Sequence, residues 1–184
     1  MAFSSLAEID AYMKTNKCEF WEAVIREEAR DSQQPEMDIV NRMTQMYRSM
    51  KEADEAYDDS LTSRSGLSGK NGKKMADYAA THKCMCGKFG GAVMARAIKM
   101  AESNACMKRI VAAPTAGSCG VVPAILITYE RMTNTSENDM VKALFVAAGI
   151  GDVIARRASI SGARGGCQAE IGASSAMAAG ALAW

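Results

Sequence analysis

The sequence predicts an all-α fold. Apolar residues recur at spacings of three and four through most of the chain, which is typical of amphipathic helices. No internal repeat occurs, and strands do not alternate steadily with helices as they do in an α/β protein. We therefore predict one multi-helix domain over residues 1–184, with N-terminal helices to about residue 60, buried Gly/Ala-rich helices, and small-residue loops from about residue 61 to 184.

Three helices are expected in the first third of the chain. Ser5 and Glu8 fit a capping box, and apolar residues follow them at helical spacing. A second helix is expected over about residues 19–29, and Pro35 starts a longer third one. Its methionines are typical of flexible core filling, with a copper or partner site as the alternative. These are Met37, Met43, Met46 and Met50.

Four further helices are expected, separated by loops of small residues. The final segment, IGASSAMAAGALAW, is apolar and lacks the glycine cap or charged last turn that usually closes a helix, so we expect the complete protein to continue beyond it. The predicted helices cover residues 73–80, 90–102, 121–131 and 138–148. The predicted loops cover residues 61–74, 113–120 and 158–166.

Composition excludes several classes of function. The 184 residues are 48% hydrophobic and 23% charged, as in ordinary globular proteins, and carry a net charge of +1. With this balance the sequence shows no basic patch of the kind that binds nucleic acid or a membrane surface. No signal peptide opens the chain, so a cytoplasmic location is expected. The longest uncharged run, residues 110–129, contains prolines and glycines and is not expected to span a membrane.

One cysteine stands in a setting suited to chemistry. In GARGGCQAEIG, Cys167 follows two glycines and begins a helical pattern. Helix N-termini stabilise a thiolate, and glycines let a bulky group approach the backbone, so Cys167 is a candidate metal ligand or nucleophile. A structural cysteine is the alternative. The six cysteines are spaced too irregularly for a disulfide framework.

Two loops are candidate anion sites. In APTAGSCG, residues 113–120, backbone amides could form a nest for a carboxylate or phosphate, and a tight packing loop is the alternative. SGLSGKNGKK, residues 65–74, departs from the spacing of a phosphate-binding loop, because five residues separate Gly66 from Gly72 and a lysine follows Lys73. ATP is therefore not expected, whereas a small carboxylate fits.

The single histidine offers little chemistry. His82 precedes Cys84 and Cys86, but a zinc site needs a further pair of ligands that the sequence lacks. A Ser-His-Asp triad is not expected either, because His82 is far along the chain from the glycine loops. No general base is assigned.

Three ordered stretches together resemble a known family. TSRSGLSGKNGKKM, VAAPTAGSCGVVPAIL and ASISGARGGCQAEIGASSAMAAGALA are similar to the alpha chain, or catalytic domain, of bacterial iron–sulfur L-serine dehydratases, from about residue 60 to the end. The resemblance implies an all-helical catalytic domain with a 4Fe–4S cluster that acts as a Lewis acid. It implies release of pyruvate and ammonia from L-serine, with Cys167 as a cluster ligand.

The resemblance also implies a binding site and partners. It implies that two loops bind the serine carboxylate and amino group. One loop consists of Ser65, Gly66, Leu67, Ser68 and Gly69, and the other of Pro114, Thr115, Ala116 and Gly117. Lys70, Asn71 and Gly72 replace the family's usual Gly-Gly-Asp, and Cys119 is expected to be a thiol of the pocket wall.

The family's other two cluster cysteines lie in motifs that do not occur before Trp184. We therefore expect an N-terminal portion of the alpha chain, inactive alone, that pairs with a beta chain or α/β domain as a heterodimer or homo-oligomer. Two competing hypotheses remain: a cluster-free helical module that binds anions or serves as a scaffold, and an acyl-transfer enzyme with Cys167 as nucleophile.

Overall fold

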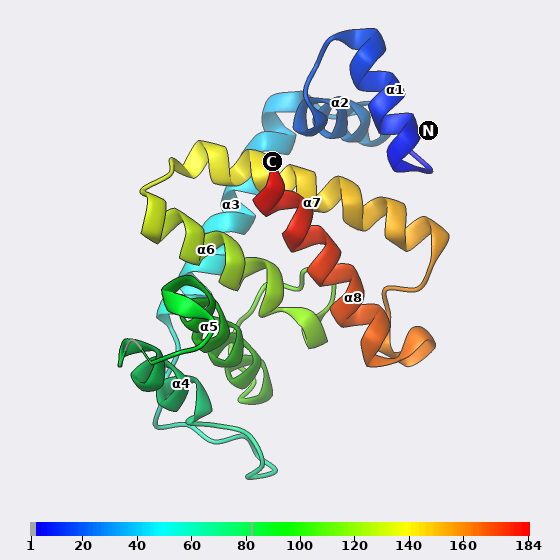
Figure 1. Cartoon of the computed structure of the whole chain (residues 1–184). Coiled ribbons are helices and arrows are strands. Elements are labelled where there is room, and N and C mark those ends of the chain that lie inside the picture. Colours follow the sequence, from blue (N-terminus) through cyan, green and yellow to red (C-terminus); the bar gives the residue numbers. More distant parts are fainter. Residues whose placement is uncertain (1–2, 82) are drawn as a thin grey trace. The chain divides into compact units, whose positions relative to one another are not determined.

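The computed structural model describes residues 3–81 and 83–184 and is built from helices (Figure 1). No strand occurs in these residues, which confirms the predicted all-α class. The elements are α1 (Leu6–Asn16), α2 (Phe20–Ser32), α3 (Glu36–Glu55), α4 (Asn71–Ala80), α5 (Gly87–Ala105), the 3₁₀ turn η1 (Ala116–Ser118), α6 (Val121–Thr133), α7 (Glu137–Arg157) and α8 (Gly162–Ala183).

The chain divides into two compact units. Unit 1 combines the described part of Met1–Tyr47 with Ser136–Trp184, and unit 2 is Arg48–Thr135. The division does not follow the predicted boundary near residue 60, because α7 packs against α2 and carries α8 with it. The description of residues 1–184 as one domain stays a prediction.

The start of α1 shows how local sequence sets a helix boundary. Ser5 Oγ accepts a hydrogen bond from the Glu8 amide at 3.2 Å, which confirms the predicted N-cap. The Glu8 carboxylate accepts a hydrogen bond from the Ser4 amide at 2.7 Å, one residue earlier than a capping box predicts. Both contacts satisfy backbone amides near the start of the helix.

α7 runs to Arg157, well beyond the predicted end at Ala148. Two glycines that lower helix propensity lie within it, and each faces a side chain of a neighbouring helix at close range. A Cβ at Gly149 would lie 2.5 Å from Val24 Cγ2 of α2, and one at Gly151 would lie 2.9 Å from Met177 Sδ of α8. The glycines therefore bring α2 and α8 close to α7, and the helix continues through them.

The predicted loop over residues 158–166 is wrong from Gly162 onward. The amides of Arg164 and Gly165 donate hydrogen bonds to the Ser161 carbonyl at 3.2 and 2.8 Å, so a helical turn forms here. Only Gly166 departs from helical geometry inside α8, with φ 75° and ψ 174°. The small residues thus form a kinked helix start and not a loop.

In unit 2, α5 packs against α4 and also against α6. The approach to α6 is close, because a Cβ at Gly120 would lie 2.6 Å from the Ala97 carbonyl oxygen. A polar network also connects the helices: Arg96 Nε donates to Asp54 Oδ1 at 2.8 Å, and Arg96 Nη1 donates to Thr128 Oγ1 at 2.7 Å. These contacts join α3, α5 and α6 through one guanidinium group.

The uncharged run over residues 110–129 contains an irregular segment, then η1 and most of α6. The Ala113–Pro114 peptide bond within it is cis. Within residues 3–81 and 83–184, no helix combines the length and apolarity that crossing a membrane requires.

Candidate functional site

Cys167 is the first residue after the kink in α8. Gly166 has a positive φ that favours glycine, and helical geometry resumes at Cys167. The thiol side chain is exposed, and no other part of the protein lies within 4 Å of the position that a Cβ on Gly166 would occupy. Cys167 thus opens the part of α8 that follows the Gly166 kink, with open space beside Gly166, and a helical turn stands where a loop was predicted before it.

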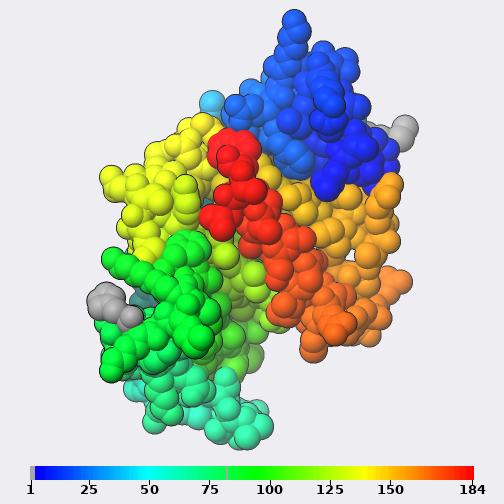
Figure 2. Space-filling model, in the orientation of Figure 1, coloured from blue at the N-terminus to red at the C-terminus, as the bar shows by residue number. Residues whose placement is uncertain are grey.

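The rest of α8 holds this cysteine on unit 1. Its inner face packs against α7 through Ala173, Met177 and Ala181, which are buried. Its outer face lies on the surface in Figure 2, where α8 is coloured orange to red. Ile171 and Leu182 are exposed on this helix. The cysteine therefore stands at the N-terminal end of a helix fixed along one side.

Glu170 lies next to the start of the same helix. A Cβ at Gly162 would lie 2.6 Å from Glu170 Oε2, so the carboxylate folds back over the first residue of α8. Any larger residue at position 162 would displace it. The glycine and the glutamate thus share the space beside the kink that precedes Cys167.

The predicted loop of residues 65–69, called loop 65–69 below, is a compact turn in unit 2. The Ser63 amide donates to the Ser68 carbonyl at 2.7 Å, and the Ser68 amide donates to Ser63 Oγ at 3.1 Å. Gly69 has φ 148°, and a Cβ there would lie 2.6 Å from the Leu61 carbonyl oxygen. Leu67 is 89% exposed at the tip. The structure thus gathers all five predicted residues in one self-bonded turn.

The predicted loop of residues 114–117, called loop 114–117 below, leads into η1. Thr115 Oγ1 and Ser118 Oγ are 3.0 Å apart, and the amides of Ser118 and Cys119 donate to the carbonyls of Thr115 and Ala116. Two amides of the predicted anion nest are therefore used within the loop. Cys119 is buried, and burial raises the pKa of its thiol, while its expected place in a pocket wall stays a prediction.

Sequence reasoning missed one acidic residue beside these loops. Glu102, on α5, is only 3% exposed and accepts hydrogen bonds from the Asn71 amide, the Gly72 amide and the Tyr57 hydroxyl. Burial alone would raise the pKa of Glu102, but the bonds from Gly72, Tyr57 and Asn71 hold it below the ordinary value. Glu102 is therefore ionised at neutral pH, and it holds the start of α4, two residues beyond loop 65–69.

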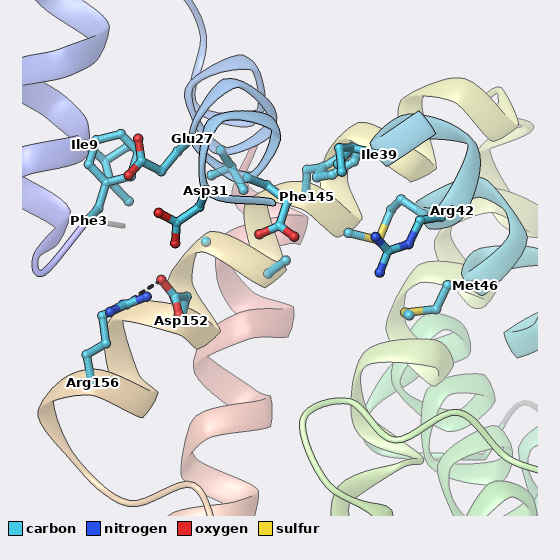
Figure 3. Close-up of a pocket in the computed structure, with 15 residues that line it drawn as sticks. Phe3, Ile9, Glu27, Asp31, Ile39, Arg42, Met46, Phe145, Asp152 and Arg156 are labelled. Atoms are coloured by element: carbon cyan, nitrogen blue, oxygen red, sulfur yellow. Dashed lines mark hydrogen bonds and ion pairs between the residues drawn. The ribbon is translucent and has the colours of Figure 1, made fainter. Parts of the chain in front are cut away.

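Two larger hollows lie elsewhere. A cavity of about 310 Å³ in unit 1 has an apolar wall that includes Phe145, and Figure 3 shows Asp31 of α2 and Asp152 of α7 facing the same space. Asp152 is paired there with Arg156 at 2.9 Å. A second hollow, of about 380 Å³ in unit 2, is lined by alanines and by basic residues such as Lys99. Neither is lined by a predicted site residue.

The metal-ligating residues are dispersed in the described part of the chain. Across residues 3–81 and 83–184, no three side chains of His, Cys, Asp or Glu come together in an arrangement that could hold a metal ion. His82 lies outside the described residues, while Cys84 is half-buried and Cys86 is exposed. Cys167 is therefore not part of such a group in the described residues.

These features define a helical protein with an exposed thiol, Cys167, directly after a glycine kink in α8, and with two small-residue loops. The family model described as the serine dehydratase alpha chain matches residues 15–184. The chain therefore belongs to the serine dehydratase alpha chain family, as the resemblance of its motifs predicted.

Similar proteins carry related names. The chain is 34% identical over 180 residues to the probable L-serine dehydratase, alpha chain, of Bacillus subtilis (strain 168), covering 98% of this chain and 60% of that protein. It is 44% identical over 110 residues to the L-serine dehydratase, alpha chain, of Peptoniphilus asaccharolyticus, covering 60% and 38%. For L-serine dehydratase 1 of Escherichia coli (strain K12), 88 residues are 46% identical, covering 47% and 19%. The chain thus spans at most 60% of these relatives.

Proposed function

We propose that this chain is an N-terminal portion of the alpha subunit of an L-serine dehydratase, which converts L-serine to pyruvate and ammonia in the cytoplasm. Family membership supports the class of reaction. The observation that carries the proposal is the placement of Cys167, an exposed thiol at a helix start that a Gly166 kink leaves open on one side. A cysteine kept only for packing would be buried.

In this proposal Cys167 holds one iron of a 4Fe–4S cluster. The fit is good for a single ligand, because the thiol is accessible and no protein atom crowds the Gly166 side. Thiolates are the usual ligands of such clusters, and a bound cluster supplies Lewis-acid chemistry toward the serine hydroxyl. The remaining ligands belong, in this proposal, to a part of the subunit outside these 184 residues.

The two loops would bind the rest of the substrate. Loop 65–69 offers serine hydroxyls, which are suitable donors for a carboxylate. Loop 114–117 offers the Thr115 hydroxyl and backbone carbonyls, which could accept from an ammonium group. Loop 65–69 is closed by its own hydrogen bonds, which use the amides of Gly66 and Ser68 and order the turn before the substrate arrives.

The general base is assigned to no residue of this chain. We propose that a beta chain or α/β domain completes the site, and that the 184 residues alone do not turn over L-serine. The term complete enzyme is used below for the full-length alpha chain together with that beta chain or α/β domain.

The test is an assay of the complete enzyme purified without oxygen. The expected result is equal amounts of pyruvate and ammonia from L-serine, with loss of turnover after exposure to air. A cluster-loaded complete enzyme that leaves L-serine unchanged would contradict the proposal. A helical anion-binding or scaffold module, the alternative, would bind small carboxylates and take up no iron after anaerobic addition of iron and sulfide.

A further inference from the structure

Glu102 holds the start of α4, the helix that follows loop 65–69. Its Oε1 accepts from the Asn71 amide at 2.8 Å, and its Oε2 accepts from the Gly72 amide at 3.0 Å and from Tyr57 Oη at 2.7 Å. These amides open α4 and follow loop 65–69 by two and three residues. Helices leave such amides unpaired, and Lys70, at the N-cap, makes no side-chain cap. A carboxylate from α5 therefore caps α4.

The second loop is held from the same end of α5. Asn104 Nδ2 donates a hydrogen bond of 3.1 Å to the carbonyl of Ala116, inside loop 114–117. Further along, the Lys108 amide donates to the Ser103 carbonyl at 2.9 Å, which closes the C-terminal end of α5. Asn104, which holds the second loop, thus lies at a helix C-terminus that is capped by a backbone hydrogen bond.

Helix geometry explains how adjacent positions serve different loops. Residues two apart on an α-helix point about 200° apart around the axis, and therefore to nearly opposite sides. Glu102 faces α4, and Asn104 faces η1, the two elements between which this part of α5 lies. One rigid helical turn thus fixes the start of α4, which follows loop 65–69, and a point inside loop 114–117.

We infer that Glu102 and Asn104 form a loop clamp, a pair of positioning residues that sets the spacing between loop 65–69 and loop 114–117. Its role in catalysis rests on the proposed function, because it matters for L-serine only if both loops bind that substrate. The hydrogen bonds of the clamp lie within unit 2 and do not depend on the proposed function. A substrate held by its carboxylate at one loop and its amino group at the other requires that spacing to be correct before binding.

The clamp is tested first by amide hydrogen exchange on the 184-residue chain. Glu102→Gln puts an amide donor next to the Asn71 and Gly72 amides, and exchange should accelerate about tenfold over residues 63–72, as expected for loss of bonds to a charged acceptor. Asn104→Ala should accelerate exchange about fivefold over residues 115–118. Each variant should leave the other loop unchanged.

A matched control separates this effect from general loss of stability. Glu130 of α6 is half-buried and pairs with Lys51 at 3.2 Å without a bond to either loop, so Glu130→Gln removes a carboxylate charge from the same unit. It should change exchange in neither loop. Equal acceleration throughout unit 2 in the Glu102 and Asn104 variants, or no acceleration in either loop, would overturn the clamp.

The second measurement is steady-state kinetics of the complete enzyme. Both clamp variants should raise KM for L-serine about tenfold and leave kcat within about twofold, because misplaced loops must be ordered by the substrate itself. A fall in kcat at constant KM would show a merely structural role and overturn the inference. If the unmodified enzyme does not use L-serine, the proposed function fails, and the exchange experiment still decides whether the clamp exists.

Discussion

The hydroxyl of Tyr57 donates a 2.7 Å hydrogen bond to the buried carboxylate of Glu102. Burial, together with this bond to an anion, raises the pKa of Tyr57 to about 12. The same bond helps to hold the pKa of Glu102 below its ordinary value. The hydrogen bond therefore joins the segment after α3 to α5. Tyr57 stays protonated and Glu102 stays ionised across a wide pH range.

The pair predicts how stability depends on pH. Glu102 has a lowered pKa in the folded protein, so its contribution is present above its unfolded pKa and is lost as pH falls through the folded value. Tyr57 has a raised pKa, so its contribution is complete below pH 10 and is lost as pH rises to about 12. Urea denaturation at a series of pH values should show a decline at both ends.

A Tyr57→Phe variant isolates the alkaline part. Between pH 10 and 12 its free energy of unfolding should fall by less than that of the unmodified chain. The difference between the two losses should be on the order of 2 kcal/mol. Tyr12→Phe, in unit 1, is the matched control, because it removes a tyrosine hydroxyl and leaves the bond between Tyr57 and Glu102 in place. An unchanged alkaline slope in Tyr57→Phe would refute the assignment.

The polar network of unit 2 predicts a large stability loss. The side chains of Asp54 and Arg96 are only 5% and 14% exposed, so Asp54→Ala leaves a guanidinium group without its main acceptor in a mostly dry site. The expected loss is about 3 kcal/mol of unfolding free energy. Asp77→Ala removes an exposed ion pair with Lys73 and should barely move the denaturation midpoint. Equal effects of the two changes would contradict the packing of α3, α5 and α6.

Two glycines should respond in opposite directions to alanine. At Gly120 the new methyl group meets the backbone of Ala97, and Gly120→Ala should cost about 1 to 3 kcal/mol of unfolding free energy. At Gly172 nothing lies within 4 Å, and Gly172→Ala should add about 0.5 to 1 kcal/mol through better helix propensity. Thermal unfolding of both variants tests this, and the same sign for both would be inconsistent with the structure.

The cysteines should differ in chemical reactivity. Cys167 is exposed, whereas Cys119 is 2% exposed and its thiol has a raised pKa because of burial. Under native conditions a thiol reagent should label Cys167 at least about tenfold faster than Cys119. Peptide mass spectrometry over time gives both rates in one sample. In denaturant the two rates should converge, and native rates that already agree would place Cys119 at the surface.

Local signals made much of the fold predictable. Ser5 with Glu8 predicted the start of α1, and apolar spacing predicted the helices because each one buries a single stripe. Periodicity did not show where a helix stops when packing overrides propensity, as at Gly149. The predicted methionine core shows the same limit: core filling is confirmed for Met50, at 1% exposed, and wrong for Met37 and Met46, at 68% and 46%.

The candidate site was predictable only in its contiguous parts. Cys167 and the two loops are marked by glycines and small residues within a few positions of one another. Glu102 had no such signal, because the amides it accepts from lie 30 and 31 positions away. Its role follows from the packing of α5 against α4, which single-residue patterns do not encode.

The most direct test of the central claim is the iron content and L-serine turnover of the complete enzyme carrying Cys167→Ser, prepared without oxygen. Cys86→Ser is the matched control, because Cys86 is also exposed and precedes a helix, where serine is well tolerated. The account predicts that Cys167→Ser loses most of the iron and the turnover, while Cys86→Ser keeps both. A Cys167→Ser enzyme with unchanged iron content and unchanged turnover would contradict it.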